Sequence, residues 1–315
     1  MVAIVIILPA YNEELTIAGT IESFYKELPE AKIVVVNNNS ADHTVRIAQE
    51  TFARLGATGE VIHEDMQGKG NAVRRAFTDI EADVYVMCDA DMTYPADRIH
   101  DLITPVLEGR AAMVVGDRLS EGHYREENKR KFHDFGNHLV KWLINKLFKA
   151  DLTDIMSGYR VFSRKFVKNY PILVEGFQIE TDVTLHALDK RFAIVEMPVE
   201  YKDRPEGSFS KLNTFSDGAR VLLTITKIMR QFKPLLFFGA FACLFGALGI
   251  LASWPVFSDW IREQYIYHVP MAVLAVALEL LAMIFVSIGL ILDSIAHQHK
   301  MDFEWRMLNY KERDL

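Results

Sequence analysis

The sequence contains little cysteine and no excess of positive charge. Only two of its 315 residues are cysteines, Cys88 and Cys243, which excludes a disulfide framework. Both lie in apolar runs, so we expect two small, buried side chains. Acidic residues outnumber basic ones by 42 to 35, and the formal net charge of -7 argues against a nucleic-acid-binding protein. Repeats and low-complexity tracts are also absent, and 50% hydrophobic residues suffice for a full α/β core.

Charge is missing from one long stretch near the C-terminus. From Pro234 to Trp254, 21 residues contain no Asp, Glu, Lys or Arg. At about 1.5 Å per helical residue, this run spans the roughly 30 Å of a bilayer core. A second apolar run, from Val269 to Leu292, contains only Glu279 as a charged residue, and the Trp and Tyr residues between the runs suit a membrane interface. We therefore predict an integral membrane protein with two transmembrane helices joined by a hairpin loop.

Basic residues flank the outer ends of the two predicted spans. The loop between the spans has only Arg262, whereas the flanks carry Lys227, Arg230, Lys233, Lys300, Arg306, Lys311 and Arg313. Because basic residues resist translocation, we expect both termini and the domain that precedes the spans to be cytoplasmic. The ten apolar N-terminal residues are too short for a span and follow no basic residue, so they predict a buried strand instead of a signal peptide.

Strand-like and helix-like patterns alternate through the first half of the sequence. This alternation is typical of an α/β fold in which helices cover both faces of a parallel sheet. The predicted strands are residues 3–8, 32–36, 61–62 and 83–88, and the predicted helices are residues 13–28, with Asn12 as N-cap, 41–55 and 71–79. Ligands of such sheets bind outside the carboxyl ends of the strands, so polar residues at those ends are candidate site residues.

Polar motifs follow three of the predicted strands. The first strand ends in PAYNE (residues 9–13), the second in NNNSAD (residues 37–42), and the fourth in Asp89-Ala90-Asp91. The two aspartates emerge together from an apolar run and need a counter-charge. Mg²⁺ or Mn²⁺ would provide it, because both prefer oxygen ligands and can bridge a diphosphate. The alternative is a pair of exposed turn aspartates, which an isolated D-x-D would favour.

These motifs, with GDR (116–118), TDIMSGYR (153–160) and RPEGSFSKL (204–212), resemble glycosyltransferase family 2 enzymes with a GT-A fold. The two spans narrow the resemblance to polyprenyl-phosphate glycosyltransferases, which include dolichol-phosphate mannose synthases and bactoprenol glucosyltransferases. The resemblance implies a cytoplasmic, Rossmann-like nucleotide-diphospho-sugar transferase domain followed by membrane helices. Its parts would be a catalytic domain (1–212), an amphipathic interface helix (213–233), a transmembrane hairpin (234–296) and a cytoplasmic tail (297–315).

The resemblance also implies roles for individual residues. Asp89 and Asp91 would hold Mg²⁺ or Mn²⁺, and Asp91 and Arg118 would be catalytic. The donor site would comprise Pro9, Tyr11, Glu13, Asn37, Asp89, Glu180, Arg204 and Lys211, to which we add Lys69 from the glycine-flanked sequence QGKGN. The lipid phosphate would contact Arg118, Lys129, Arg130 and Lys131. Two positions depart from the pattern of relatives, which carry Asp in place of Asn37 and Gln in place of Thr93.

The expected activity is inverting, metal-dependent transfer of a monosaccharide from a nucleotide sugar to a polyprenyl phosphate at the cytoplasmic membrane face. Asn37 and Thr93 favour UDP-glucose or UDP-N-acetylglucosamine, and GDP-mannose is the alternative donor. The acceptor phosphate, with a second pKa of about 6, is largely dianionic and needs no general base.

Two other functions compete with this one. A processive polysaccharide synthase would need more spans and a Q-x-x-R-W motif, neither of which the sequence contains. A membrane scaffold would bind nucleotide sugar without turnover. The resemblance permits a homo-oligomer.

Overall fold

The computed structural model describes residues 2–120, 131–176, 178–202, 204–205 and 217–310. The chain divides into two compact units, Met1–Phe215 with Lys311–Leu315 and Ser216–Tyr310. The first unit is α/β and the second consists of helices. This arrangement confirms the predicted class, an α/β domain followed by two long apolar helices.

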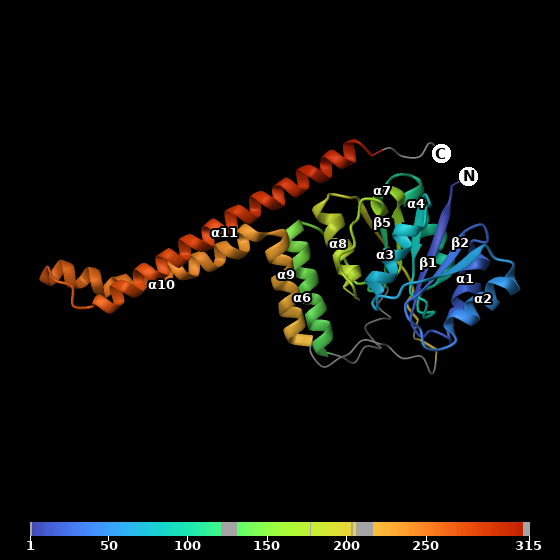
Figure 1. Cartoon of the computed structure of the whole chain (residues 1–315), viewed down its shortest axis with the longest axis horizontal. Helices are drawn as coiled ribbons and strands as arrows, with labels where there is room; N and C mark the ends of the chain where they lie inside the picture. The colour runs from blue at the N-terminus through green and yellow to red at the C-terminus, as the bar shows by residue number, and fades with distance from the viewer. Residues whose placement is uncertain (1, 121–130, 177, 203, 206–216, 311–315) are drawn as a thin grey trace. The chain divides into compact units, whose positions relative to one another are not determined.

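A mixed sheet forms the centre of the first unit (Figure 1). It has seven strands in the order β3-β2-β1-β4-β6-β5-β7. Its strands are β1 (Ile4–Ala10), β2 (Lys32–Asn37), β3 (Gly59–His63), β4 (Val84–Met87), β5 (Met113–Asp117), β6 (Arg160–Ser163) and β7 (Ile194–Pro198). Strands β1 to β4 are parallel, as the alternating pattern predicts. Strand β6 runs antiparallel to both β4 and β5, an orientation that the sequence pattern did not reveal.

The helices of this unit are α1 (Ile17–Glu27), α2 (Thr44–Leu55), α3 (Lys69–Asp79), η1 (Ala96–Arg98), α4 (Ile99–Leu107), α6 (Lys131–Phe148), α7 (Arg164–Val167) and α8 (Ile179–Asp189). Three of them, α1, α2 and α3, correspond to the three predicted helices, and their starts differ from the predicted ones by two to four residues. The predicted N-cap role of Asn12 is wrong. Asn12 lies in the left-handed region, with φ of 52°, and its side-chain oxygen accepts a hydrogen bond of 2.7 Å from the Ala41 amide. It therefore joins two loops instead of capping a helix.

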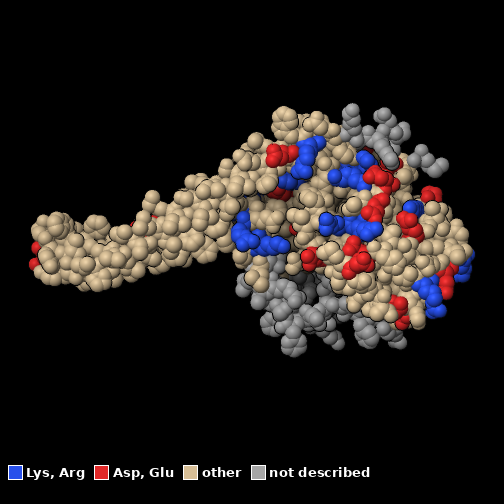
Figure 2. Space-filling view, viewed as in Figure 1, with Lys and Arg blue, Asp and Glu red and all other residues tan. Residues whose placement is uncertain are grey.

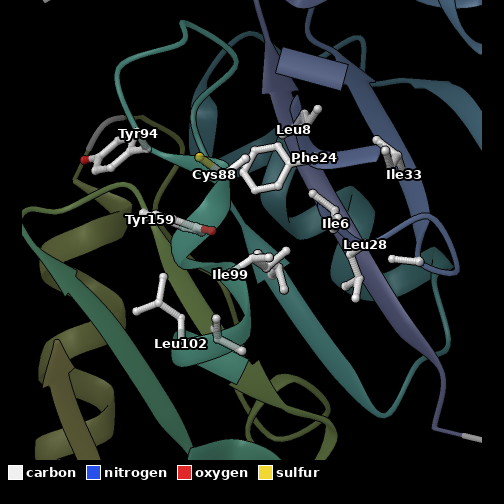
Figure 3. Close-up of a cluster of buried hydrophobic side chains, with 14 of the residues drawn as sticks. Ile6, Leu8, Phe24, Leu28, Ile33, Cys88, Tyr94, Ile99, Leu102 and Tyr159 are labelled. Carbon is white, nitrogen blue, oxygen red and sulfur yellow. The ribbon is translucent and has the colours of Figure 1, made fainter. Parts of the chain in front are cut away.

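Side chains on the two faces of the sheet form two hydrophobic cores. Along β1, Ile6 and Leu8 belong to one core, and Val5 and Ile7 belong to the other. Helices α1, α2 and α4 complete the first core, which Figure 3 shows in part, and helices α3, α7 and α8 complete the second. Because β1 is buried on both faces, its sequence is apolar throughout. Cys88 lies in the first core, as expected.

The second unit contains α9 (Asp217–Phe232), α10 (Pro234–Glu263) and α11 (Val269–Leu308). Helices α10 and α11 run alongside each other and are long and apolar enough to span a membrane. Figure 2 shows very few charged side chains on their visible face. Gly249 permits their close approach, since a Cβ there would lie 2.7 Å from Oε1 of Glu279. The expectation that Cys243 is buried is wrong, because its side chain lies on the exposed surface of α10.

Candidate active site

The candidate site lies at the edge of the sheet where β1, β2 and β4 end. Ala10 of β1 pairs with Asn37 of β2, and the Cys88 amide donates to the Ile7 carbonyl at 3.1 Å. The parallel register therefore brings the polar segments after these three strands to the same edge. Tyr11, Asn37 and Asp89 all leave the sheet there, although they come from different parts of the sequence.

Asp91 is the more buried of the two aspartates after β4. Its side chain is 4% exposed. Its Oδ1 accepts hydrogen bonds from the Thr93 amide at 3.2 Å and the Thr93 hydroxyl at 2.6 Å. Burial and the neighbouring charge of Asp89 nevertheless raise the pKa of Asp91 above its usual value. A cation beside this carboxylate therefore favours its ionised form.

Arg204 supplies one such cation. Its Nη2 lies 2.6 Å from Oδ2 of Asp91, and its Nη1 lies 3.8 Å from Oε1 of Glu13. Glu13 follows β1, so the guanidinium joins the ends of two neighbouring strands. The Arg204 side chain is 27% exposed, which leaves it accessible from solvent.

Lys69 supplies a second cation from the first residue of α3. Its Nζ donates to Asp89 and to Glu180, the latter near the start of α8. Lys69 and Glu180 are each 8% exposed, whereas Asp89 is 29% exposed. Burial disfavours the ammonium, but the two carboxylates hold the pKa of Lys69 above its usual value. The interaction joins α3, the end of β4 and α8.

Asparagines hold the loops of this edge in place. The side-chain oxygen of Asn37 accepts from the Ser40 amide, and its Nδ2 is 3.2 Å from Nδ1 of His63. Asn38 donates to the Met66 carbonyl at 2.7 Å and accepts from the Gly68 amide at 2.7 Å. These bonds tie the loop after β2 to the segment that leads into Lys69. Asn37 is buried, and both polar atoms of its amide have partners within the protein.

Arg118, the residue directly after β5, forms an ion pair with the carboxylate of Asp154. Its Nε and Nη2 lie 2.7 Å and 3.0 Å from the two oxygens of Asp154, a bidentate ion pair. Burial opposes ionisation of Asp154, but Arg118 holds the pKa of that carboxyl below its usual value. The guanidinium also lies 5.4 Å from the ring centre of Tyr201. Arg118 is therefore positioned by Asp154 and Tyr201 together.

The oxygen ligands of this site suit a divalent cation that is shared with a substrate. Asp89 and Asp91 provide carboxylates, the ligands that Mg²⁺ and Mn²⁺ prefer. Within the described ranges, no group of three or more His, Cys, Asp or Glu side chains is arranged to hold a metal. Two carboxylates completed by phosphate oxygens are a usual Mg²⁺ site in enzymes that act on nucleotides. The residues present fit that kind of site.

Comparison with known proteins decides the family. The sequence profile described as "Glycosyl transferase family 2" matches residues 5–170, which include most of β1, the Asp89-Ala90-Asp91 motif and β6. The chain belongs to glycosyl transferase family 2. It is a glycosyltransferase with a GT-A-like fold, which confirms the resemblance seen in the sequence motifs.

Two curated glycosyltransferases of Haloferax volcanii illustrate the relationship. Glycosyltransferase AglJ is 29% identical to this chain over 95% of each protein. A dolichyl-phosphate hexose transferase is 26% identical over 71% of this chain and 92% of its own length. The crystal structure of glucosyl-3-phosphoglycerate synthase from Mycobacterium tuberculosis with Mn²⁺, UDP and phosphoglyceric acid has a TM-score of 0.55 at 21% identity. It covers 72% of this chain and 78% of that one, and the likeness supports the GT-A-like fold.

Most residues predicted for the site of this glycosyltransferase lie near the edge of the sheet where β1, β2 and β4 end. Strand β1 carries Pro9, and Tyr11 follows it, 38% exposed. Two groups of ion pairs, Lys69 with Asp89 and Glu180 and Arg204 with Glu13 and Asp91, form a charged cluster, in which the charge of Asp89 also acts on Asp91. Arg118 belongs to the separate pair with Asp154. Lys129, Arg130 and Lys211 lie outside the described residues, as does the side chain of Lys131.

Three contributors to the glycosyltransferase site were not singled out from the sequence. Gly158 packs under Asp89, because a Cβ there would lie 2.3 Å from Asp89 Oδ2. Arg160 is fully buried and donates to the carbonyls of Ser157 and Ile155 at 2.8 Å. Glu196 accepts from the Asp154 amide at 2.9 Å. The motif that contains Gly158 and Arg160 was visible in the sequence, but nothing there connects Glu196 with Asp154.

Proposed function

We propose that this glycosyltransferase moves a monosaccharide from a nucleotide sugar to a polyprenyl phosphate at the cytoplasmic face of a membrane. The reaction would be inverting and would depend on Mg²⁺ or Mn²⁺. UDP-glucose and UDP-N-acetylglucosamine are the favoured donors. The catalytic domain would lie in the cytoplasm with both termini.

One observation carries this proposal. Two strand-end carboxylates, Asp89 and Asp91, lie with the cations Lys69 and Arg204 in a chain that continues into two helices able to span a membrane. The charged cluster suits a diphosphate with a divalent cation, and the helices suit a lipid-linked acceptor. A relative named for transfer to dolichyl phosphate supports the same acceptor class.

The proposed roles follow from the chemistry of each group. A divalent cation on Asp89 and Asp91 would neutralise the charge that develops on the leaving nucleoside diphosphate. Arg204 and Lys69 would contact the donor phosphates. Arg118, held by Asp154, would position the acceptor phosphate with its planar guanidinium. From the sequence resemblance we also propose that Lys129, Arg130 and Lys131 contact the acceptor phosphate and that Lys211 contacts the donor.

Donor choice is the finer part of the proposal. Asn37 stands where relatives of the resembled group carry an aspartate, and an amide can both donate to and accept from a uracil edge. GDP-mannose is the competing donor. A scaffold that binds nucleotide sugar without turnover is the competing function, and the intact charged cluster argues against it.

A matrix assay tests these assignments together. The full-length protein in detergent is mixed with polyprenyl phosphate, Mg²⁺ or Mn²⁺ and each of several UDP- and GDP-sugars, and lipid-linked products are identified by mass. We expect product with a UDP-sugar and a divalent cation only. Product with GDP-mannose alone would reverse the donor assignment. Nucleotide-sugar binding without any product would favour the scaffold.

The variant Asp91→Asn tests the role of the metal carboxylate. We expect kcat to fall about 1000-fold, because the charge on the leaving group would lose its stabilisation. The variant Asp97→Asn, which changes an exposed aspartate of η1, is the matched control. Wild-type activity of Asp91→Asn in the same assay would contradict the assigned site.

A further inference from the structure

Both proposed metal carboxylates are already held by cations of the chain itself. Nζ of Lys69 contacts Asp89 and Glu180, and Nη2 of Arg204 lies 2.6 Å from Oδ2 of Asp91. The second oxygen of Asp91 accepts the Thr93 hydroxyl at 2.6 Å. A divalent cation placed on these aspartates would meet an ammonium and a guanidinium at close range, and like charges repel at such short distances in a partly buried site.

The formal charges of this cluster suggest what replaces those contacts. Four carboxylates, from Glu13, Asp89, Asp91 and Glu180, contact two cations, Lys69 and Arg204. Two formal negative charges remain, the number that one divalent cation balances. A donor diphosphate adds negative charge and offers the two cations new partners. Metal and diphosphate would therefore each favour the binding of the other.

The backbone around Lys69 is held in place by close contacts, so the part of this residue that can move is its side chain. A Cβ at Gly68 would lie 2.1 Å from the Glu175 carbonyl oxygen, and one at Gly70 would lie 2.0 Å from that of Val174. The Asn71 amide donates to the Glu175 carbonyl at 3.2 Å. These contacts hold the start of α3 against the segment before α8. A lysine chain anchored there can turn at its flexible end while its backbone stays in place.

We propose that Lys69 and Arg204 are exchangeable counter-cations, which occupy Asp89 and Asp91 without donor and transfer to the donor diphosphate when a divalent cation binds. This inference rests on the proposed function for the identity of the donor. It assigns Lys69 two opposite effects: it weakens the binding of metal alone and strengthens the binding of diphosphate with metal. A residue that only supports the fold would weaken both.

The variant Lys69→Met tests the exchange, because it keeps an unbranched side chain and removes the charge. Mn²⁺ binding to the full-length protein in detergent is measured by electron paramagnetic resonance, without nucleotide and with UDP or GDP. We expect Mn²⁺ without nucleotide to bind to Lys69→Met at least tenfold more tightly than it binds to the wild type. The affinity for UDP at saturating Mn²⁺ should fall at least tenfold.

Matched variants keep the test decisive. Lys69→Arg should retain wild-type behaviour in both measurements. Arg204→Met changes a partly exposed side chain and should also tighten Mn²⁺ binding without nucleotide, which covers the case that Lys69→Met does not fold. Lys168→Met removes another ion-paired lysine, which contacts Glu81 at 2.9 Å, and should change neither affinity.

The outcomes separate this inference from the proposed function. If Mn²⁺ without nucleotide bound to Lys69→Met and to Arg204→Met no more tightly than to the wild type, the exchange would be overturned, even if the wild type makes lipid-linked sugar. Opposite changes in Mn²⁺ and UDP affinity would support the exchange, even if no lipid acceptor is used. If neither UDP nor GDP bound in the presence of Mn²⁺, the exchange and the proposed function would both be overturned.

Discussion

Thr93 stands two residues after Asp91, where relatives of the resembled group carry a glutamine. Its hydroxyl donates to Asp91 Oδ1 at 2.6 Å and lowers the pKa of that carboxyl, against the larger effects of burial and of Asp89. A hydroxyl that orients a metal carboxylate commonly contributes about tenfold or more to metal affinity. At the residue scale, Thr93 thus supports ionised Asp91.

The variant Thr93→Val should raise the pKa of Asp91 further, because it removes the hydroxyl but keeps the branched shape. A proton would then compete with the metal at higher pH. We expect Mn²⁺ affinity in the presence of UDP to fall about tenfold and the acidic limb of the pH–activity profile to move to higher pH. Thr93→Ser retains the hydroxyl and is the control. An unshifted profile in Thr93→Val would show that the hydroxyl does not support Asp91.

Asp154 is a buried carboxylate whose pKa lies below its ordinary value, since Arg118 outweighs burial. A folded-state pKa below the unfolded one means that ionised Asp154 stabilises the fold. That contribution is complete above the unfolded value of about 3.9 and is lost as the pH falls through the lower folded value. We expect Asp154→Asn to reduce the free energy of unfolding by about 3 kcal/mol at neutral pH, because it leaves Arg118 without its charged partner.

The stability difference between wild type and Asp154→Asn should therefore shrink as the pH drops below about 4. Denaturant unfolding of both proteins in detergent from pH 7 down to pH 3 measures it. Asp151→Asn, an exposed carboxylate in the same loop, serves as the control. A difference that stays constant over this range would contradict the linkage to Asp154.

At the scale of elements, the loop before β6 supports the end of β4. The Gly158 amide donates to the Tyr94 hydroxyl at 2.7 Å, and a Cβ on Gly158 would lie 2.3 Å from Oδ2 of Asp89. Only a glycine leaves room for the carboxylate at this position. The pairing of β6 with β4 therefore matters for the site, because it places Gly158, just before β6, against Asp89 of the proposed metal site.

The variant Gly158→Ala should displace Asp89 without unfolding the protein, since the Asp89 side chain is 29% exposed and can move outward. We expect transfer activity to fall at least about tenfold, with a change of only a few degrees in the unfolding temperature. At Gly176, a Cβ would meet no atom of the described residues within 4 Å, so Gly176→Ala is the control. Full activity of Gly158→Ala would show that the position of Asp89 tolerates the shift.

At the scale of the whole molecule, the flanking charges predict the orientation of the helical hairpin. Lys233 precedes α10, and Lys300 and Arg306 lie in the C-terminal part of α11, whereas the opposite end of the hairpin has only Arg262, near the end of α10. The prediction is that Glu263 faces the outside and Asn309 the cytoplasm. Both side chains are exposed.

Single cysteines placed in a Cys243→Ser background test this orientation. A membrane-impermeant maleimide should label Glu263→Cys in intact cells and Asn309→Cys only after lysis. The remaining native cysteine, Cys88, is buried and serves as the internal background. Labelling of Asn309→Cys in intact cells would reverse the orientation and would place the tail outside.

The sequence by itself determined the parts whose signals are local. Apolar runs and helical periodicity located β1 to β4, the helices between them and the two apolar helices, because burial acts on each segment through its own composition. Motifs at strand ends located Asp89 and Asp91, because parallel strands of an α/β sheet end at one edge, and the family resemblance of the segment RPEGSFSKL added Arg204.

Only the tertiary structure decided which charges meet. Lys69 and Glu180 are separated by 111 residues, and Arg118 and Asp154 by 36. No local pattern records such pairings, since an ion pair depends on where distant backbones place two side chains. The same reason explains the errors at Asn12, whose partner is Ala41 of another loop, and the unforeseen reversal of β6. Strand direction and ion-pair partners come from packing across the sheet, which a single segment does not contain.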